Sequence, residues 1–301
     1  MSWIPWIQIE NDDTSKEEVE LVCPPMLKGE IDAMKKEIFR ENVFIITGAS
    51  SGIGEELALQ LADHGAWLTL AARTAEKLQK VAEECIQRGG RAVAIPTDVS
   101  DQSQCKKLID SAIEEYGRID TLINNASIAA AASFYEYQDL AVFEKSVQIN
   151  FMGSVFCTFY ALPYLKETRG RLVGVSSMAG KCPTAKASGY NSSKAAVTGF
   201  YNSLRQELVG SGVTVTGIYP GFINTGITGR AITASGDKTG KQMAQEANGM
   251  PVETCVRLII KAVEKRKREA IIPAWCKILP WMNLIAPRTF EKITQKSRKV
   301  D

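Results

Sequence analysis

Histidine, closely spaced cysteines and long apolar runs are scarce or absent in this sequence. A single histidine, His64, excludes any site built from several histidines, and its place before Gly65 at an expected helix end favours a structural role. The seven cysteines are irregularly placed, and no two lie two or three residues apart. That pattern excludes a zinc ribbon and favours free thiols in a reducing compartment. We therefore expect no metal site.

Net charge is also close to zero, with 36 Lys and Arg against 34 Asp and Glu. A nucleic-acid-binding domain is usually strongly basic, so we expect no nucleic-acid partner. The charge is uneven, because residues 1–41 carry ten acidic and five basic side chains and residues 261–301 carry four and eleven. The basic end fits either a solvated face, which we favour, or contact with an anionic surface. No run approaches the ~20 apolar residues of a membrane span, and no targeting peptide is evident, so we expect a cytoplasmic protein.

From residue 43 onward, short apolar segments alternate with longer amphipathic ones. The short segments are typical of strands buried on both faces, and several of the intervening segments end at a glycine, as helices do. The alternation predicts an α/β fold: a single doubly wound Rossmann-type domain with a seven-stranded parallel sheet flanked by helices. The expected strands are 43–47, 67–71, 92–96, 121–124, 171–176, 214–219 and 270–273, and the expected helices are 52–64, 75–89, 101–116, 138–166, 189–210 and 251–267.

Three segments lie outside this alternation. Residues 1–41 form an N-terminal extension, and residues 274–301 form a tail that mixes tryptophan, proline and basic residues. Residues 222–250 are rich in Gly, Thr, Ser and Ala and show no strand pattern, so we expect a mobile substrate loop. We place the nucleotide-binding domain, including this loop, at 42–273.

A glycine-rich turn joins the first expected strand to the first expected helix. Glycines let the backbone approach a pyrophosphate closely, and the free N–H groups and dipole of the helix stabilise its charge. Because the turn opens a strand–helix–strand unit, we interpret it as a dinucleotide site rather than an ordinary turn. The residues expected to contact the cofactor here are Gly48, Ser50, Ser51, Gly52, Ile53 and Gly54.

The end of the second expected strand indicates which dinucleotide binds. NAD enzymes usually carry an acidic residue here to hold the adenosine ribose, whereas this chain has Arg73 and Thr74. Arg73 can pair with the 2′-phosphate of NADP, assisted by the Thr74 hydroxyl; the alternative is a surface arginine. We favour NADP(H), with NAD(H) as the alternative.

Tyr190 and Lys194 lie four residues apart on an expected helix, on one face and one turn apart. A phenol titrates near pH ~10, but an ammonium ~4 Å away at an effective dielectric of about 20 favours the phenolate by ~4 kcal/mol. That would lower the tyrosine pKa to near ~7, where Tyr190 can exchange a proton with a carbonyl or alcohol oxygen. Lys194 could also hold the nicotinamide ribose. Ser177, at the end of the fifth expected strand, is placed to hydrogen-bond the reacting oxygen.

Together these motifs resemble the short-chain dehydrogenase/reductase family over about residues 43–273. They occur in the family's order and at plausible spacing. Ser127 stands where the family usually has glycine, and Ser51 stands where NADP-preferring members often have a basic residue, so the NADP prediction depends mainly on Arg73. Besides the residues above, the matching positions are Asp98, Val99, Asn124, Asn125, Ala126, Asn150, Pro220, Gly221, Ile223 and Thr225.

The resemblance implies roles for these residues. The Asp98 position contacts the adenine, and the two asparagines 124 and 125 steady the central strands and the cofactor. Asn150 completes a catalytic tetrad with Ser177, Tyr190 and Lys194 by holding a water for proton relay. Thr225 and the backbone near residue 223 contact the nicotinamide amide. Family members commonly form dimers, here through helices 138–166 and 189–210, so we expect a homodimer or homotetramer.

Residues 176–181 and the tail bear a looser similarity to hydroxysteroid dehydrogenases and membrane-associated lipid reductases. Two segments concern the substrate. Small residues 127–133 beside Phe134, Tyr135 and Tyr137 suit a bulky apolar substrate, or else pack helices. The tail, with Trp275, Trp281 and basic neighbours, together with Trp3 and Trp6, is expected either to contact a membrane peripherally or to cover an active site or the core.

The sequence therefore predicts an NADP(H)-dependent oxidoreductase that interconverts a carbonyl and a secondary alcohol, on an apolar or lipid-like small molecule. Two alternatives stay open. One is an NAD-dependent alcohol dehydrogenase working in the oxidative direction. The other is a non-catalytic nucleotide-sensing regulator, although regulators of that type usually lose the tyrosine or the lysine, and both stand here. The sequence leaves the substrate and the direction of the reaction open.

Overall fold

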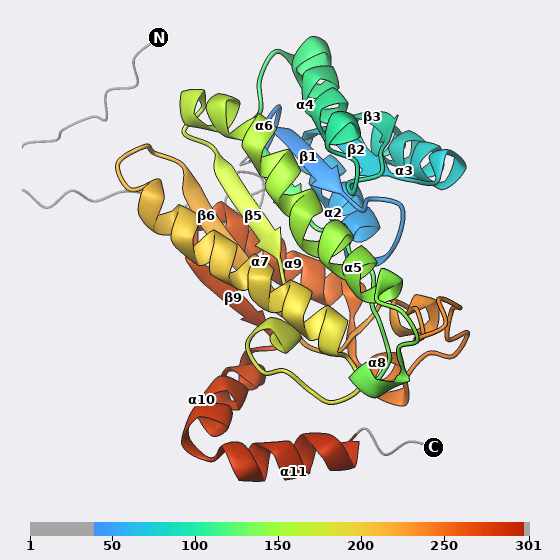
Figure 1. Cartoon of the computed structure of the whole chain (residues 1–301). Helices are drawn as coiled ribbons and strands as arrows, with labels where there is room; N and C mark the ends of the chain where they lie inside the picture. The colour runs from blue at the N-terminus through green and yellow to red at the C-terminus, as the bar shows by residue number, and fades with distance from the viewer. Residues whose placement is uncertain (1–38, 298–301) are drawn as a thin grey trace, which may run out of the picture. The chain divides into compact units, whose positions relative to one another are not determined.

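Seven parallel strands form one sheet in the order β3-β2-β1-β4-β5-β6-β9 (Figure 1). The computed structural model describes residues 39–297, with side chains to residue 294. The chain runs outward from β1 to β3 and then returns to β4 on the other side of β1, which confirms the doubly wound fold. The strands are β1 (Val43–Thr47), β2 (Trp67–Ala72), β3 (Arg91–Pro96), β4 (Thr121–Asn124), β5 (Arg171–Val175), β6 (Thr214–Pro220) and β9 (Glu269–Ile272).

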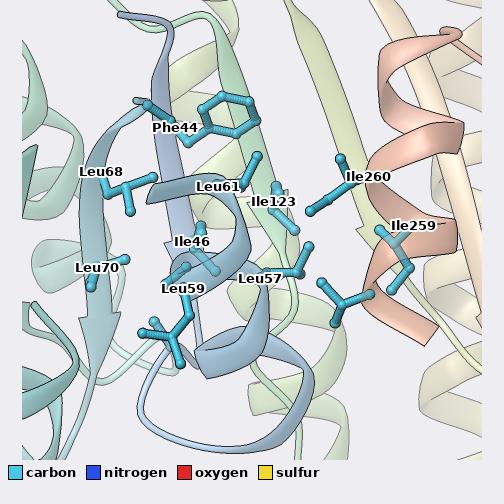
Figure 2. Packing of buried hydrophobic residues seen from close by; sticks show 14 of the residues in the cluster. Phe44, Ile46, Leu57, Leu59, Leu61, Leu68, Leu70, Ile123, Ile259 and Ile260 are labelled. Carbon is cyan, nitrogen blue, oxygen red and sulfur yellow. The ribbon is translucent and has the colours of Figure 1, made fainter. Parts of the chain in front are cut away.

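Two apolar clusters hold helices to the two faces of the sheet. Successive strand residues point to opposite faces, so Phe44 and Ile46 of β1 join one cluster and Ile45 joins the other. Figure 2 shows the first cluster, where Leu57 and Leu61 pack with these strand residues. Its helices are α2 (Gly52–Ala62), α3 (Ala75–Gln87) and α9 (Val252–Glu264), and those of the second cluster are α4 (Gln102–Tyr116), α6 (Gly153–Glu167) and α7 (Ser188–Glu207).

The predicted elements are found within three residues of their expected ends, with two exceptions. The helix expected over 138–166 consists of α5 (Ala141–Val147), a π-helix η2 (Gln148–Met152) and α6. Segment 222–250, expected to lack strands, contains a two-residue strand β7 (Ile223–Asn224) paired with β8 (Met250–Pro251). The prediction that this segment contains no strand was therefore wrong at both of its ends. These strands are too short to give an alternating pattern in the sequence. Between them lie the short helices η4 (Thr228–Arg230) and α8 (Ala244–Ala247).

The tail folds against its own domain. It forms η5 (Ala274–Lys277), α10 (Ile278–Ile285) and α11 (Pro287–Ser297), which follow β9 (Figure 1). Phe290 is 3% exposed and packs with Tyr219 and Met178 in a third apolar cluster. Within residues 39–297, no helix is both long and apolar enough to cross a membrane. The extension up to residue 38, with Trp3 and Trp6, and residues 298–301 lie outside the described residues.

Candidate active site

A large cavity, about 1470 Å³, collects most of the predicted site residues. It is lined by residues that follow β1 to β6, as expected for the point where a doubly wound sheet reverses its strand order. The predicted residues that line it are Gly48, Ser50, Ser51, Gly52, Ile53, Arg73, Thr74, Asp98, Val99, Asn125, Ala126, Ser177, Tyr190, Lys194, Pro220, Gly221, Ile223 and Thr225. Gly54, Asn124 and Asn150 are not among the lining residues.

The glycine turn at the start of α2 has little room for side chains at its glycines. Gly48 and Gly52 have φ angles of 69° and 60°, in the left-handed region that favours glycine. A Cβ at Gly48 would lie 2.8 Å from the Cα of Ala126, and one at Gly54 would collide with the Gly48 carbonyl. The Ser51 side chain makes no capping hydrogen bond to α2. This bare turn at a helix N-terminus fits the pyrophosphate of a dinucleotide.

Thr47 and Asn125 brace this turn from behind. The Thr47 hydroxyl oxygen accepts hydrogen bonds from the backbone N–H groups of Asn125 and Ala126, both at 3.0 Å. In return, the Asn125 amide donates to the carbonyls of Thr47 at 2.9 Å and Gly48 at 3.3 Å. The end of β1 is thus tied to the segment after β4, which fixes the floor of the cavity.

Asn124 points the other way, toward the helices. Its amide donates to the Tyr201 hydroxyl at 2.7 Å and to the Thr158 hydroxyl at 3.0 Å. Neighbouring strand residues face opposite sides of the sheet, which explains why Asn125 lines the cavity and Asn124 does not. The Asn124 side chain thus makes strand-steadying contacts and does not line the cavity, and its predicted contact with the cofactor stays a prediction.

Arg73 and Thr74 lie exposed on the rim of the cavity, after β2. Asp98, after β3, is fixed by its Oδ1 atom, which accepts from the Ser100 hydroxyl at 2.6 Å and the Ser100 N–H at 3.0 Å. Lys77 also lines this end and was missed in the sequence. It follows Arg73 by four residues at the start of α3, and that helical spacing was the available signal.

Lys194 is fully enclosed beneath Tyr190. Its Nζ donates to the Val175 carbonyl at 2.9 Å and lies 5.8 Å from the centroid of the Tyr190 ring. Burial lowers the pKa of Lys194 to about 7. The sequence argument treated this lysine as fully charged, whereas burial works against its charge as well as strengthening its field. Burial alone therefore brings the pKa of this lysine close to neutral pH.

Two serines at the end of β5 have separate contacts. Ser176 donates to the Lys194 carbonyl at 2.9 Å and so ties β5 to α7. The Ser177 hydroxyl oxygen accepts from the N–H of Ala179 at 3.2 Å. Because this bond uses only an oxygen lone pair, the Ser177 hydroxyl keeps its proton for an acceptor in the cavity.

Asn150 lies in the π-helix and is 1% exposed. Its side chain accepts from the Ile128 N–H at 2.8 Å and donates to the Ile128 carbonyl at 3.0 Å and the Ser193 hydroxyl at 2.9 Å. It therefore joins the segment after β4 to the helix of Tyr190. The expected water-holding role stays a prediction.

Part of the apolar lining of the cavity comes from the tail, for which covering an active site was one of the expected alternatives. Phe134 and Tyr137 pack instead with Phe143, at ring distances of 6.1 and 6.4 Å, and neither they nor Tyr135 line the cavity. A capping box at Ser133 begins the short helix that carries these aromatics. Of the two alternatives for this segment, packing therefore fits the aromatic side chains. Together with small and apolar residues such as Ile128, Ala130 and Met178, the tail lines the cavity through Trp275, Cys276, Leu279, Met282, Phe290, Ile293 and Thr294.

The substrate loop crosses to the opposite side of the cavity. The Ile232 N–H donates to the Ala129 carbonyl, and the Ala131 N–H donates to the Ile232 carbonyl, both at 2.9 Å. Four exposed cations that the sequence analysis did not predict also line the cavity: Lys145, Arg230, Lys238 and Lys241.

Comparison with known proteins gives consistent matches. The model of a family described as short chain dehydrogenase matches residues 42–235, more than half of the chain. A protein of Sesamum indicum named 11-beta-hydroxysteroid dehydrogenase A is 37% identical over 83% of this chain and 73% of its own length. An 11-beta-hydroxysteroid dehydrogenase-like protein 4A of Arabidopsis thaliana is 38% identical over 81% of each chain.

Solved structures share the fold. A short chain dehydrogenase/reductase of Burkholderia phymatum in complex with NAD has a TM-score of 0.74 at 23% identity, covering 83% of this chain and 95% of that one. An alcohol dehydrogenase of the archaeon Thermococcus sibiricus, complexed with 5-hydroxy-NADP, has a TM-score of 0.67 at 26% identity, covering 77% and 96%.

Proposed function

Because the chain belongs to the short-chain dehydrogenase family and is an alcohol/carbonyl oxidoreductase that uses a nicotinamide cofactor, we propose that it is an NADP(H)-dependent enzyme acting on an apolar ketone or secondary alcohol. One observation carries the proposal. A single cavity joins the glycine turn after β1, the Arg73 rim and the Tyr190–Lys194 pair to an apolar wall.

The nicotinamide cofactor would lie across the carboxyl ends of the strands, where it supplies or accepts a hydride. The turn from Gly48 to Ile53 would hold its pyrophosphate, and Asp98 its adenine. Arg73, with Lys77 one turn further on, places two cations where a 2′-phosphate has to be held. No acidic residue stands at the end of β2 to hold a free ribose hydroxyl, because Ala72 is followed by Arg73 and Thr74, and this favours NADP(H).

The proton is handled by groups of this chain. Tyr190 gives its phenolic proton to the substrate oxygen during reduction, and Ser177 donates a hydrogen bond to the same oxygen. Lys194 then returns a proton toward Tyr190, since its pKa of about 7 lets it release and regain one at neutral pH. Oxidation of an alcohol uses the same contacts in reverse.

The substrate class follows from the tail. The wall formed by residues 275–294 is largely apolar, and a rigid, bulky carbon skeleton buries the most surface against it. The hydroxysteroid names of the relatives from Sesamum indicum and Arabidopsis thaliana agree with such a skeleton. We therefore place the enzyme in lipid metabolism, with a sterol-like or other polycyclic ketone as the substrate class.

Two contact surfaces belong to the same proposal. On α6, Phe159 is 67% exposed, and α6 and α7 are the helices through which we propose that a homodimer forms. On the tail, Trp281 is 63% and Leu284 73% exposed, beside the basic residues Lys277 and Arg288. An apolar face edged by cations suits peripheral contact with a membrane. We propose that the protein resides in the cytoplasm and makes this contact from there.

The test is calorimetric titration of wild type and Arg73→Ala with NADPH and NADH. A charged, bidentate contact is worth about 1.5–3 kcal/mol, so wild type should prefer NADPH by at least about tenfold, and the variant should lose most of that preference. Arg91→Ala, a change at an exposed arginine away from the cavity, should keep it. Equal affinity of wild type for NADH and NADPH would instead favour the NAD-dependent alcohol dehydrogenase. Failure to bind either dinucleotide would contradict the proposed function.

A further inference from the structure

The cavity carries more positive charge than the cofactor accounts for. Among the described residues, seven lysines and arginines line it, against two carboxylates, Asp98 and Glu246. The proposed function uses Arg73 and Lys77 at the 2′-phosphate and Lys194 in proton transfer. A substrate that consists only of an apolar skeleton would give the remaining cations nothing to bind. These cations are Lys145, Arg230, Lys238 and Lys241, all of them exposed.

The substrate loop folds into a hairpin that brings three of these cations together. Its two arms pair through a hydrogen bond of 3.1 Å from the Gly240 N–H to the Gly229 carbonyl and through an antiparallel bridge between residues 232 and 238. Arg230 therefore stands on one arm, and Lys238 and Lys241 stand on the other arm or just after it.

The hairpin lies against α5, which carries the fourth cation (Figure 1). A Cβ added at Gly236, in the turn of the hairpin, would lie 4.0 Å from the Cγ2 atom of Val142. Lys145 follows Val142 by three residues, so both side chains lie on the helix face that meets the hairpin. The cations of the loop and of α5 therefore line the same part of the cavity.

In the part of the chain whose side chains the structure describes, residues 39–294, no ion pair neutralises these four cations. Glu246 is 1% exposed, and its carboxylate accepts hydrogen bonds from donors within residues 225–228 at the base of the loop. The acidic neighbours in the sequence, Glu144 and Asp237, do not line the cavity. Cations that share a cleft with apolar walls attract an anion more strongly than they would in open water.

Arg230 is placed differently from the three lysines. Its Nη2 atom donates to the Thr225 carbonyl at 3.2 Å, and a Cβ added at Gly226 would lie 3.6 Å from its Nη1 atom. Thr225 in turn lies beside the glycine turn, because a Cβ added at Gly52 would lie 3.2 Å from the Thr225 Cβ. Arg230 therefore belongs to the cofactor end of the cavity, and the three lysines are the cations without a role.

We propose that the substrate is an amphiphile whose apolar part lies against the tail and whose anionic group is bound by Lys145, Lys238 and Lys241. The inference rests on the proposed function, because it specifies the substrate class of the same cavity. A lysine ammonium acts as a point charge on a flexible side chain and does not require one geometry of its partner. Three such groups suit a carboxylate as well as a sulfate or phosphate ester at the end of the molecule away from the ketone.

The experiment uses three esters of dehydroepiandrosterone, a polycyclic ketone: the sulfate, the hemisuccinate and the neutral acetate. Their dissociation constants are measured by calorimetry on protein saturated with NADP⁺, with which a ketone does not react. The esters share the ketone and the ring skeleton, so they differ only in the charge at the far end. Wild type should bind at least one anionic ester about tenfold or more tightly than the acetate, since hydrogen bonds to charged groups are the strong ones.

Removal of the lysines tests where the anion binds. Lys145→Met, Lys238→Met and Lys241→Met should each reduce the preference for the anionic ester by about twofold to fivefold, and the three changes combined should remove it. Lys107→Met, an exposed change on α4 away from the cavity, is the matched control and should keep the preference. The affinity for NADP⁺ is measured in every variant, because cations that held the cofactor phosphates would lower it.

The outcomes separate this inference from the proposed function. A preference in wild type and in Lys107→Met that the combined variant loses at unchanged NADP⁺ affinity supports the inference, and the tighter ester tells a sulfate-like anion from a carboxylate. Equal constants for the three esters in wild type, binding of none of them, or a preference retained by the combined variant overturns it while the NADP(H) function stands.

Two further results also decide the matter. A loss of NADP⁺ affinity in the combined variant with an unchanged preference among the esters would assign the lysines to the cofactor and overturn the inference. Failure of wild type to bind NADP⁺ overturns both proposals. If the combined variant does not fold, the three single changes decide in its place, and a preference that none of them reduces overturns the inference.

Discussion

Replacing Lys194 by methionine should stabilise the protein at neutral pH while abolishing its activity. The lysine is 3% exposed, and burial lowers its pKa to about 7, whereas an unfolded chain holds a lysine near pH ~10.4. Between these two values the unfolded state binds more protons than the folded state. Stability therefore rises with pH across this window, and the full penalty of the buried charge is present below pH ~7.

The size of the effect follows from the same two values. Each pH unit in which the two states differ by one proton changes the unfolding free energy by about 1.4 kcal/mol. From pH ~7, where the folded lysine is half protonated, to pH ~9, the wild-type protein should gain about 2 kcal/mol relative to Lys194→Met. Urea unfolding of nucleotide-free protein at several pH values measures this difference directly, because the other titrating groups cancel between the two proteins.

A matched control keeps the test specific. Lys80→Met removes an exposed lysine of α3 and should unfold with the same pH dependence as wild type. The reasoning is refuted if the wild type and Lys194→Met curves run parallel between pH ~7 and ~9, because burial would then not be lowering the lysine pKa.

Three further changes test separate parts of the structure. Asn124→Ala should lower the free energy of urea unfolding by about 1–3 kcal/mol, because the buried Tyr201 hydroxyl loses its donor, and should change NADPH affinity little. A loss of affinity at unchanged stability would contradict the orientation of the Asn124 side chain. Gly54→Ala should lower NADPH affinity by roughly tenfold or more in a binding titration, since the added Cβ pushes the turn apart. Gly199→Ala is the control and should bind NADPH normally, because nothing lies within 4 Å of its new Cβ. Phe290→Ala should speed proteolytic cleavage of the tail without changing NADPH affinity, because replacing a buried phenylalanine by alanine costs about 3–5 kcal/mol of stability. Unchanged cleavage would mean that the third apolar cluster does not hold the tail.

The sheet and the cofactor turn were predictable because local sequence determines them. A strand buried on both faces is largely apolar, and Val43–Thr47 and Thr121–Asn124 are found at the expected residues. Gly48 and Gly52 have positive φ angles, a conformation that most other residues adopt only with strain. In such places one residue type satisfies one local requirement, so the sequence alone suffices.

The remaining features depend on distant contacts. The π-helix around Asn150 is stabilised by hydrogen bonds to Ile128 and Ser193, which no local periodicity reveals. The wall made by the tail depends on Phe290 reaching Tyr219 across 71 positions of the chain. Glu246 is one of 34 acidic residues until the fold places it beside Thr225.

The position of the tail has a consequence for engineering. Most of the residues proposed for the cofactor lie before the end of β6, apart from Gly221, Ile223 and Thr225, whereas the tail adds apolar side chains to the lining after β9, between residues 275 and 293. The residues proposed for the cofactor and those that the tail adds to the substrate end of the cavity therefore lie mostly in separate stretches of the sequence. Grafting this stretch from a homologous reductase is the smallest recombination that exchanges one apolar wall for another, and a library of such chimeras would keep the same hydride donor while sampling new ketones.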